Sequence, residues 1–253
     1  MLKVERGRVK LKTLKISIVI PAYNEERLLG ESLAQIKSAA DVFTKRGWKS
    51  ELIVCDNNST DRTAEIARSA GALVIFEPFN QIARARNRGA SAATGDWLIF
   101  VDADSRPGTE LFDEVASQIT SGACLAGGAT VRLDSCHWVA QGVNALWNFL
   151  SRSFRLLAGS FIFCETATFR KIGGFNEELF AGEELELSRR LKKVASENRK
   201  RIAIIYRHPL ATSARKIYLY SFREHFRLIL RAAFNRRILT SREECHLWYD
   251  GRR

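Results

Sequence analysis

Two acidic residues one position apart, Asp102 and Asp104, follow directly after the apolar run WLIFV at residues 97–101. In an extended chain, residues i and i+2 point to the same side, so the two carboxylates can converge on one point. Carboxylate oxygens suit a hard divalent cation such as Mg²⁺ or Mn²⁺, which usually completes its coordination with water and phosphate oxygens. The pair therefore predicts a metal that holds a nucleoside diphosphate, unless one Asp only caps the next helix and the other is solvated.

A second acidic pair, Glu183 and Glu184, lies in the stretch GGFNEELFAGEELELSRRLKK at residues 173–193. The pair falls at the start of a predicted helix over 183–197, whose dipole favours negative charge at that end and by itself explains two acids there. A carboxylate at this position also has the chemistry of a general base, provided that it comes within about 3 Å of the proton that it removes. The spacing alone leaves both explanations open.

The predicted elements that must position these acids alternate between strands and helices, as in an α/β fold. Short apolar runs, which predict strands, cover residues 16–20, 51–55, 72–76, 97–101 and 160–164. Segments with a helical pattern cover residues 24–47, 59–71 and 81–95, with Ser59 or Thr60 as a cap and Gly71 and Gly95 as helix ends. The first four runs are continuously apolar rather than alternating, which is typical of strands buried on both faces of a mainly parallel sheet.

Polar and acidic residues follow each of the first four predicted strands, in the order PAYNEE, DNNSTD, EPFN and DADSRP. Ligands of open parallel sheets bind beyond the carboxyl ends of the strands, where these segments must meet. The sequence therefore predicts one binding site along a single edge of the sheet.

Several of these segments together resemble the family 2 glycosyltransferases, which are inverting sugar transferases of the GT-A fold. The resemblance runs from about residue 16 to about residue 215 through ISIVIPAYNEE, ELIVCDNNSTDRT, ARARNRGASAATGDWLIFVDAD, GSFIFCETATFRKIGGFNEELFAGEELELSRRLKK and TSARK. It implies a GT-A domain over 1–215, which includes a basic N-terminal segment at 1–15. A basic, amphipathic helical tail is expected over 216–253.

The resemblance also implies roles for individual residues. Asp104 would bind Mg²⁺ or Mn²⁺ directly, while Asp102 would hold ribose or a metal-bound water. Contacts with the nucleotide sugar are expected from Pro21, Tyr23, Glu25, Asp56, Arg86, Asp102 and Arg215. For Asp56 the less favoured alternative is a simple turn before the next helix, and for Arg86 a solvated helix face is an equal alternative.

In the family, the second acid of the pair at 183–184 is an Asp that deprotonates the acceptor hydroxyl. Here it is Glu184, one methylene longer, with Glu183 as the alternative base. The implied reaction is a single in-line displacement with inversion at the anomeric carbon. His208 is a weaker candidate for a late metal ligand, and a cap or surface role is favoured for it.

Net charge and cysteine content limit the possible binding partners and the cellular compartment. The 40 Lys and Arg residues against 28 Asp and Glu residues give a net charge of +12, which favours an anionic partner. Five scattered cysteines without a CxxC pair indicate a reducing compartment and no zinc site. We expect a cytoplasmic protein, peripheral on the inner face of a membrane if the tail and the stretch at 137–157 contact anionic lipid.

The predicted function is transfer of a sugar from a nucleoside-diphosphate sugar, with UDP weakly preferred over GDP, to an unknown acceptor that is lipid-linked or soluble. One alternative is a catalytically degenerate protein of the same fold, because Glu184 replaces the usual Asp. Another is a basic nucleic-acid-binding protein, which is disfavoured because no nucleic-acid-binding motif is recognisable and the acids at the strand ends repel phosphates.

Overall fold

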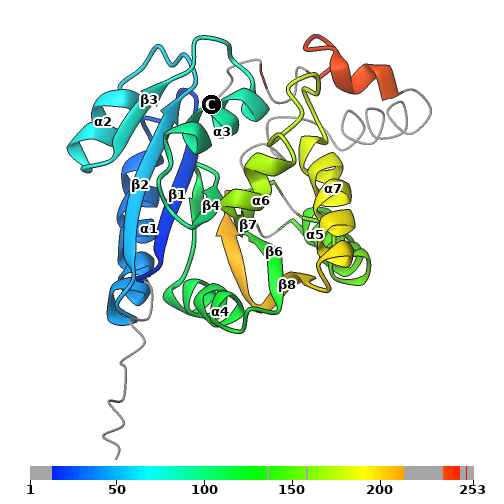
Figure 1. The fold of residues 1–253 in the computed structure, drawn as a ribbon. Coiled ribbons are helices and arrows are strands. Elements are labelled where there is room, and N and C mark those ends of the chain that lie inside the picture. Colours follow the sequence, from blue (N-terminus) through cyan, green and yellow to red (C-terminus); the bar gives the residue numbers. More distant parts are fainter. Residues whose placement is uncertain (1–12, 136, 158, 214–235, 246–248, 250–253) are drawn as a thin grey trace, which may run out of the picture.

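The structure is a computed structural model that describes residues 13–135, 137–157, 159–213, 236–245 and 249. Within these residues, eight strands form one sheet in the order β3-β2-β1-β4-β7-β6-β8-β5 (Figure 1). The strands are β1 (Lys15–Ala22), β2 (Lys49–Asp56), β3 (Leu73–Phe76), β4 (Trp97–Val101), β5 (Ser105–Arg106), β6 (Cys124–Leu133), β7 (Phe161–Glu165) and β8 (Arg201–Thr212). The helices are α1 (Leu29–Lys45), α2 (Thr63–Ser69), α3 (Ile82–Ala92), α4 (Thr109–Thr120), α5 (Trp138–Phe154), α6 (Thr166–Lys171), α7 (Glu183–Glu197) and the 3₁₀ helix η1 (Arg236–Thr240).

The first half of the sheet confirms the predicted parallel α/β arrangement. β3, β2, β1 and β4 are parallel neighbours, and Ala22 at the end of β1 is in register with Asp56 at the end of β2. β7 is inserted antiparallel between β4 and β6, so that β6 runs in the same direction as β4. The carboxyl ends of β1, β2, β4 and β6 therefore point to the same edge.

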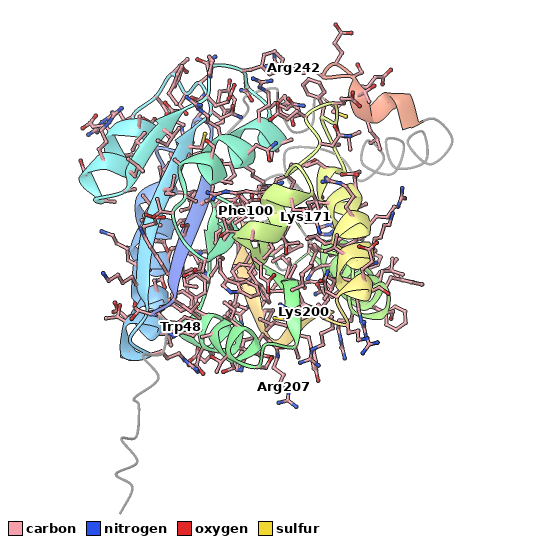
Figure 2. The ribbon with its side chains drawn as sticks, in the orientation of Figure 1. Trp48, Phe100, Lys171, Lys200, Arg207 and Arg242 are labelled. Carbon is pink, nitrogen blue, oxygen red and sulfur yellow. The ribbon has the colours of Figure 1, made fainter. Side chains whose placement is uncertain are left out.

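The continuous apolar character of the central strands is explained by burial on both faces. Ile18 and Ile99 face one core with α1 and α4, whereas Val19 and Phe100 face a second core with α3, α6 and α7. Phe100 lies in the interior of the molecule (Figure 2), where its ring centroid is 5.2 Å from those of Phe169 and Phe175. Alternate residues of one strand thus hold helices on opposite sides of the sheet.

Some predicted helix ends differ from those observed. α1 begins at Leu29 rather than at residue 24, since Asn24 has a left-handed backbone (φ 52°). α2 begins at Thr63 instead of at a Ser59 or Thr60 cap, and the Asp61 carboxylate accepts a hydrogen bond from the Thr63 N–H. Short polar side chains that bind their own backbone here favour a turn over an earlier helix start.

The two glycines expected to end helices have different roles. Gly71 follows α2 with φ 73°, as predicted. α3 ends earlier, at Ala92, and Gly95 instead lies against the backbone of β1. A Cβ at Gly95 would be 2.7 Å from the Ser17 nitrogen and 2.8 Å from the Lys15 carbonyl oxygen. Close backbone approach, and not a helix cap, therefore requires glycine at this position.

The predicted tail at 216–253 lies outside the described residues except for 236–245 and 249. Its helical and amphipathic character stays a prediction, as does the division at residue 215. No helix in the described part of the chain combines the length and the apolarity that crossing a bilayer requires.

We expect Gly95→Ala to destabilise the protein by about 1–3 kcal/mol, because the added methyl group meets backbone atoms that cannot rotate away. Gly142→Ala is the matched control, since Gly142 lies in α5 and, apart from its neighbouring helix backbone, no atom lies within 4 Å of the new methyl group. That substitution should be neutral or stabilising. Urea denaturation measures both, and equal midpoints for the two variants would contradict the packing argument.

Candidate functional site

A cleft lies at the carboxyl ends of β1, β2 and β4, where the sequence predicts the binding site. It is lined by Pro21, Ala22, Tyr23, Glu25, Asn57, Asn80, Ile82, Asp102, Ala103 and Asp104. Five of the residues predicted from the sequence are therefore brought together in one cleft: Pro21, Tyr23, Glu25, Asp102 and Asp104. Asn57 and Asn80 also line the cleft but were not predicted as site residues from the sequence. Each follows a predicted strand, and that position is the signal that could have identified them.

The β2 end of the cleft is held in shape by side chains that bind the backbone. The buried Asp56 carboxylate accepts a hydrogen bond from the Ser59 N–H at 3.0 Å. The Asn57 side-chain oxygen accepts one from the Gln81 N–H at 3.3 Å, which ties the β2 end to the start of α3. Asp56 thus makes the turn that was its structural alternative, and its contact with a base stays a prediction.

Asp102 and Asp104 lie on a tight turn between β4 and β5. The Ser105 N–H donates to the Asp102 carbonyl at 3.0 Å, and the Thr212 hydroxyl donates to the Asp104 carboxylate at 3.4 Å. Both residues line the cleft. Among the residues with described positions, no group of three His, Cys, Asp or Glu side chains is arranged to hold a metal. Two oxygen donors fit a hard divalent cation that takes its other ligands from water and phosphate.

Arg86 on α3 joins the two acidic pairs. Its guanidinium is 3% exposed and forms ion pairs with Asp102 at 3.0 Å and with Glu183 at 2.8 Å. It also donates to the carbonyl oxygen of Gly159 at 2.8 Å. Its Nε is buried without a partner. Two carboxylates and a carbonyl thus hold the guanidinium inside the protein, and its contact with the donor stays a prediction.

Glu183 and Glu184 begin α7 after Gly182, which has a left-handed backbone (φ 75°). Glu183 is buried against Arg86, and Glu184 interacts with both Glu183 and Arg86. A Cβ added at Gly159 would be 3.4 Å from the Glu184 carboxyl carbon and 3.2 Å from the Arg86 guanidinium. Burial and the neighbouring Glu183 carboxylate raise the pKa of Glu184 to about 8, against the opposing effect of Arg86. The second acid therefore has the proton affinity of a base that works near neutral pH.

The loop before α7 is held by the C-terminal segment, which the sequence did not predict. The Phe180 N–H donates to the Leu239 carbonyl at 2.7 Å, and the Tyr249 hydroxyl donates to the Phe180 carbonyl at 2.9 Å. The same hydroxyl accepts a hydrogen bond from the Ile82 N–H at 3.4 Å. Figure 1 shows this segment, in red, beside the loop that leads into α7. Tyr249 thereby connects the start of α3 to the loop that leads into the acid pair.

The two remaining predicted residues are Arg215 and His208. Arg215 lies outside the described residues, so its contact with the donor stays a prediction. His208 lies in a separate hollow beside α4, with Asp113 and Arg207 among its neighbours.

Comparison with known proteins is consistent with this geometry. A GT-A fold is defined by the mixed sheet with its flanking helices, and the chain shares it with solved sugar transferases. TarS of S. aureus superposes with a TM-score of 0.63 at 23% identity, over 91% of this chain and 73% of that one. The mannosyltransferase PcManGT of Pyrobaculum calidifontis, solved with GDP-Man and Mn²⁺, gives 0.65 at 19% identity, over 91% and 64%.

The family is established by sequence. The profile of Glycosyl transferase family 2 matches residues 17–171, which is more than half of the chain, and the chain belongs to this family. An uncharacterized glycosyltransferase of Rickettsia typhi is 35% identical over 101 residues, which is 40% of this chain and 32% of that protein. The matched segment spans about a quarter to a third of the length of the first relatives.

We expect Arg86→Met to destabilise the fold by about 3–5 kcal/mol, because it leaves the buried Glu183 carboxylate without its partner. Arg62→Met is the matched control, since Arg62 pairs with Glu65 on the surface and is 69% exposed. That change should leave the denaturation midpoint unaltered. Similar midpoints for both variants in urea would show that the buried network does not stabilise the fold.

Proposed function

We propose that the protein transfers a sugar from a nucleoside-diphosphate sugar to an acceptor hydroxyl or phosphate, with inversion at the anomeric carbon. The observation that carries this proposal is the meeting, at one sheet edge, of the Asp102 and Asp104 cleft with the acid pair that begins α7. Arg86 holds the two together. Membership of a glycosyltransferase family supports the same class of reaction.

The donor would lie in the cleft with its nucleoside toward β1 and β2. Tyr23 offers an aromatic face to the base, and the buried Asp56 lies at the end of β2. TarS has been solved with UDP and with UDP-GlcNAc, and PcManGT with GDP-Man. We favour UDP over GDP by a small margin.

A divalent cation fits the oxygen donors of Asp104 and Asp102, with Asp104 as the direct ligand. When bound, such a cation would neutralise negative charge on the diphosphate leaving group. The turn after β4 keeps both carboxylates at the cleft, and Arg86 fixes Asp102 from the buried side. Asp102 is thereby left free on its other side to accept hydrogen bonds from ribose or from water.

Glu184 is the proposed general base. In its ionised form it takes the proton from the acceptor oxygen, whose electron pair forms the new bond to the anomeric carbon. The bond from that carbon to the phosphate oxygen breaks, and the nucleoside diphosphate leaves with its electron pair. Glu183 is already occupied by Arg86, so its part is to fix the start of α7 and to raise the proton affinity of Glu184.

Titration calorimetry of UDP and GDP, with and without Mn²⁺, tests the donor site. We expect metal-dependent binding of one nucleotide that Asp104→Ala abolishes, since this change removes the direct ligand. Asp113→Ala is the control, because Asp113 lies on α4 away from the cleft. Folded protein that binds neither nucleotide would contradict the donor assignment.

We expect Glu184→Gln to lower kcat by about 10²–10⁴-fold, because the amide cannot accept the proton. Glu186→Gln, on the same helix and paired with Arg190, should retain activity. The wild-type rate should rise with pH toward the raised pKa of Glu184, since only the ionised form acts as base. A flat profile over that range, or an active Glu184→Gln protein, would exclude Glu184 as the base.

A further inference from the structure

Helix α5 is attached to the sheet by its polar side chains. The Asn144 and Asn148 amide groups donate to the Val131 carbonyl at 2.9 and 2.8 Å, and the Val131 N–H donates to the Asn148 side-chain oxygen at 2.9 Å. Gln141 reaches the Ser135 carbonyl at 2.5 Å in the same way. A surface helix ordinarily packs its apolar side on the core and turns its polar side to water. α5 has the opposite arrangement.

The apolar side chains of α5 are consequently exposed. Trp138 is 82% exposed, Leu146 59%, Phe149 64% and Phe154 61%. Together with Val143, they are half of the ten large exposed apolar side chains in the described part of the chain. We call this set the α5 face. An apolar patch concentrated on one helix marks a surface that another apolar phase or molecule covers.

Uncompensated positive charge lies at the C-terminal end of the α5 face. α5 contains no Asp or Glu, and Arg152, Arg155 and Lys192 gather where it ends, with the Lys192 ammonium bound to the Phe154 carbonyl. Burial and the nearby Arg155 lower the pKa of Lys192. No carboxylate of the described residues forms an ion pair with any of these three cations. Arg152 lies over the ring of Tyr206, at 4.2 Å from its centroid.

We propose that the α5 face docks onto an anionic lipid bilayer. The exposed aromatic and aliphatic side chains enter the boundary between headgroups and acyl chains, and the three cations meet lipid phosphates. Charge complementarity favours this partner over a second copy of the chain, because each copy carries a net charge of +12 and brings the same unpaired cations.

The position of α5 implies that docking would also orient the catalytic cleft. This step rests on the proposed function. α5 starts five residues after the end of β6, and β6 runs in the same direction as β4. Trp138 therefore lies toward the sheet edge that carries the cleft. Docking through α5 would hold that edge near the membrane surface, where a lipid-borne acceptor is presented.

Vesicle co-sedimentation at low salt tests the docking without any measurement of sugar transfer. The vesicles contain either phosphatidylcholine alone or a mixture with phosphatidylglycerol. The variants are the double change Leu146→Glu and Phe149→Glu on the α5 face and the double change Arg152→Gln and Arg155→Gln. The matched control is Leu73→Glu with Phe76→Glu, which alters two exposed apolar residues on β3.

We expect the wild type and the β3 control to bind phosphatidylglycerol vesicles and not pure phosphatidylcholine. Each α5 variant should bind at least about tenfold more weakly, as expected when two headgroup or interface contacts are removed. Brominated lipid should quench tryptophan fluorescence in the wild type, and Trp138→Phe should reduce that quenching. Circular dichroism establishes that each variant is folded.

Three results would overturn the proposal. Wild-type protein that stays in the supernatant with anionic vesicles excludes a bilayer as the partner. Binding that both α5 variants retain places the membrane contact elsewhere on the chain. Sedimentation velocity that shows a dimer, lost in the Leu146→Glu and Phe149→Glu protein without any vesicle binding, assigns the α5 face to a second copy.

Discussion

One buried guanidinium holds the candidate site together. Arg86 carries its charge into an environment with almost no water, where an isolated ion is strongly disfavoured, and it is stable there only because Asp102 and Glu183 approach from two sides. Those acids belong to the turn after β4 and to the start of α7, which are far apart in the sequence. The two ion pairs that neutralise Arg86 therefore fix the position of Asp102 in the donor cleft relative to Glu183 at the start of α7.

The elements that the sequence predicted best are those whose signal is local. The sequence correctly predicted strands β1, β2 and β4 and the helix Glu183–Glu197. A continuous apolar run and a helical repeat can each be recognised within a dozen neighbouring residues. The insertion of β7 between β4 and β6 was not predicted, since pairing between distant strands leaves no comparable trace. The network around Arg86 was missed for the same reason: a basic residue on a polar helix looks solvated until its distant partners are placed.

Helix α5 illustrates a different limit. Trp138, Leu146 and Phe149 lie on one apolar side of this helix, but the periodicity of a sequence does not say which side of a helix meets the protein. That choice depends on Val131, whose backbone groups are satisfied by Asn144 and Asn148 rather than by another strand. Amide side chains that complete the hydrogen bonding of a strand thus override the usual rule that apolar surface is buried first.

The hydrogen bonds of the C-terminal segment also bear on when the site is completed during synthesis. Phe180 and Ile82 obtain their partners from Leu239 and Tyr249, which leave the ribosome only after every strand of the sheet. Until then Phe180, in the loop before α7, lacks two of these hydrogen bonds and Ile82, at the start of α3, lacks one, while the donor cleft already has all its lining residues. The cleft that holds the nucleotide is therefore synthesised before the C-terminal segment that fixes the loop into the acid pair, and Tyr249 adds its two hydrogen bonds late in synthesis.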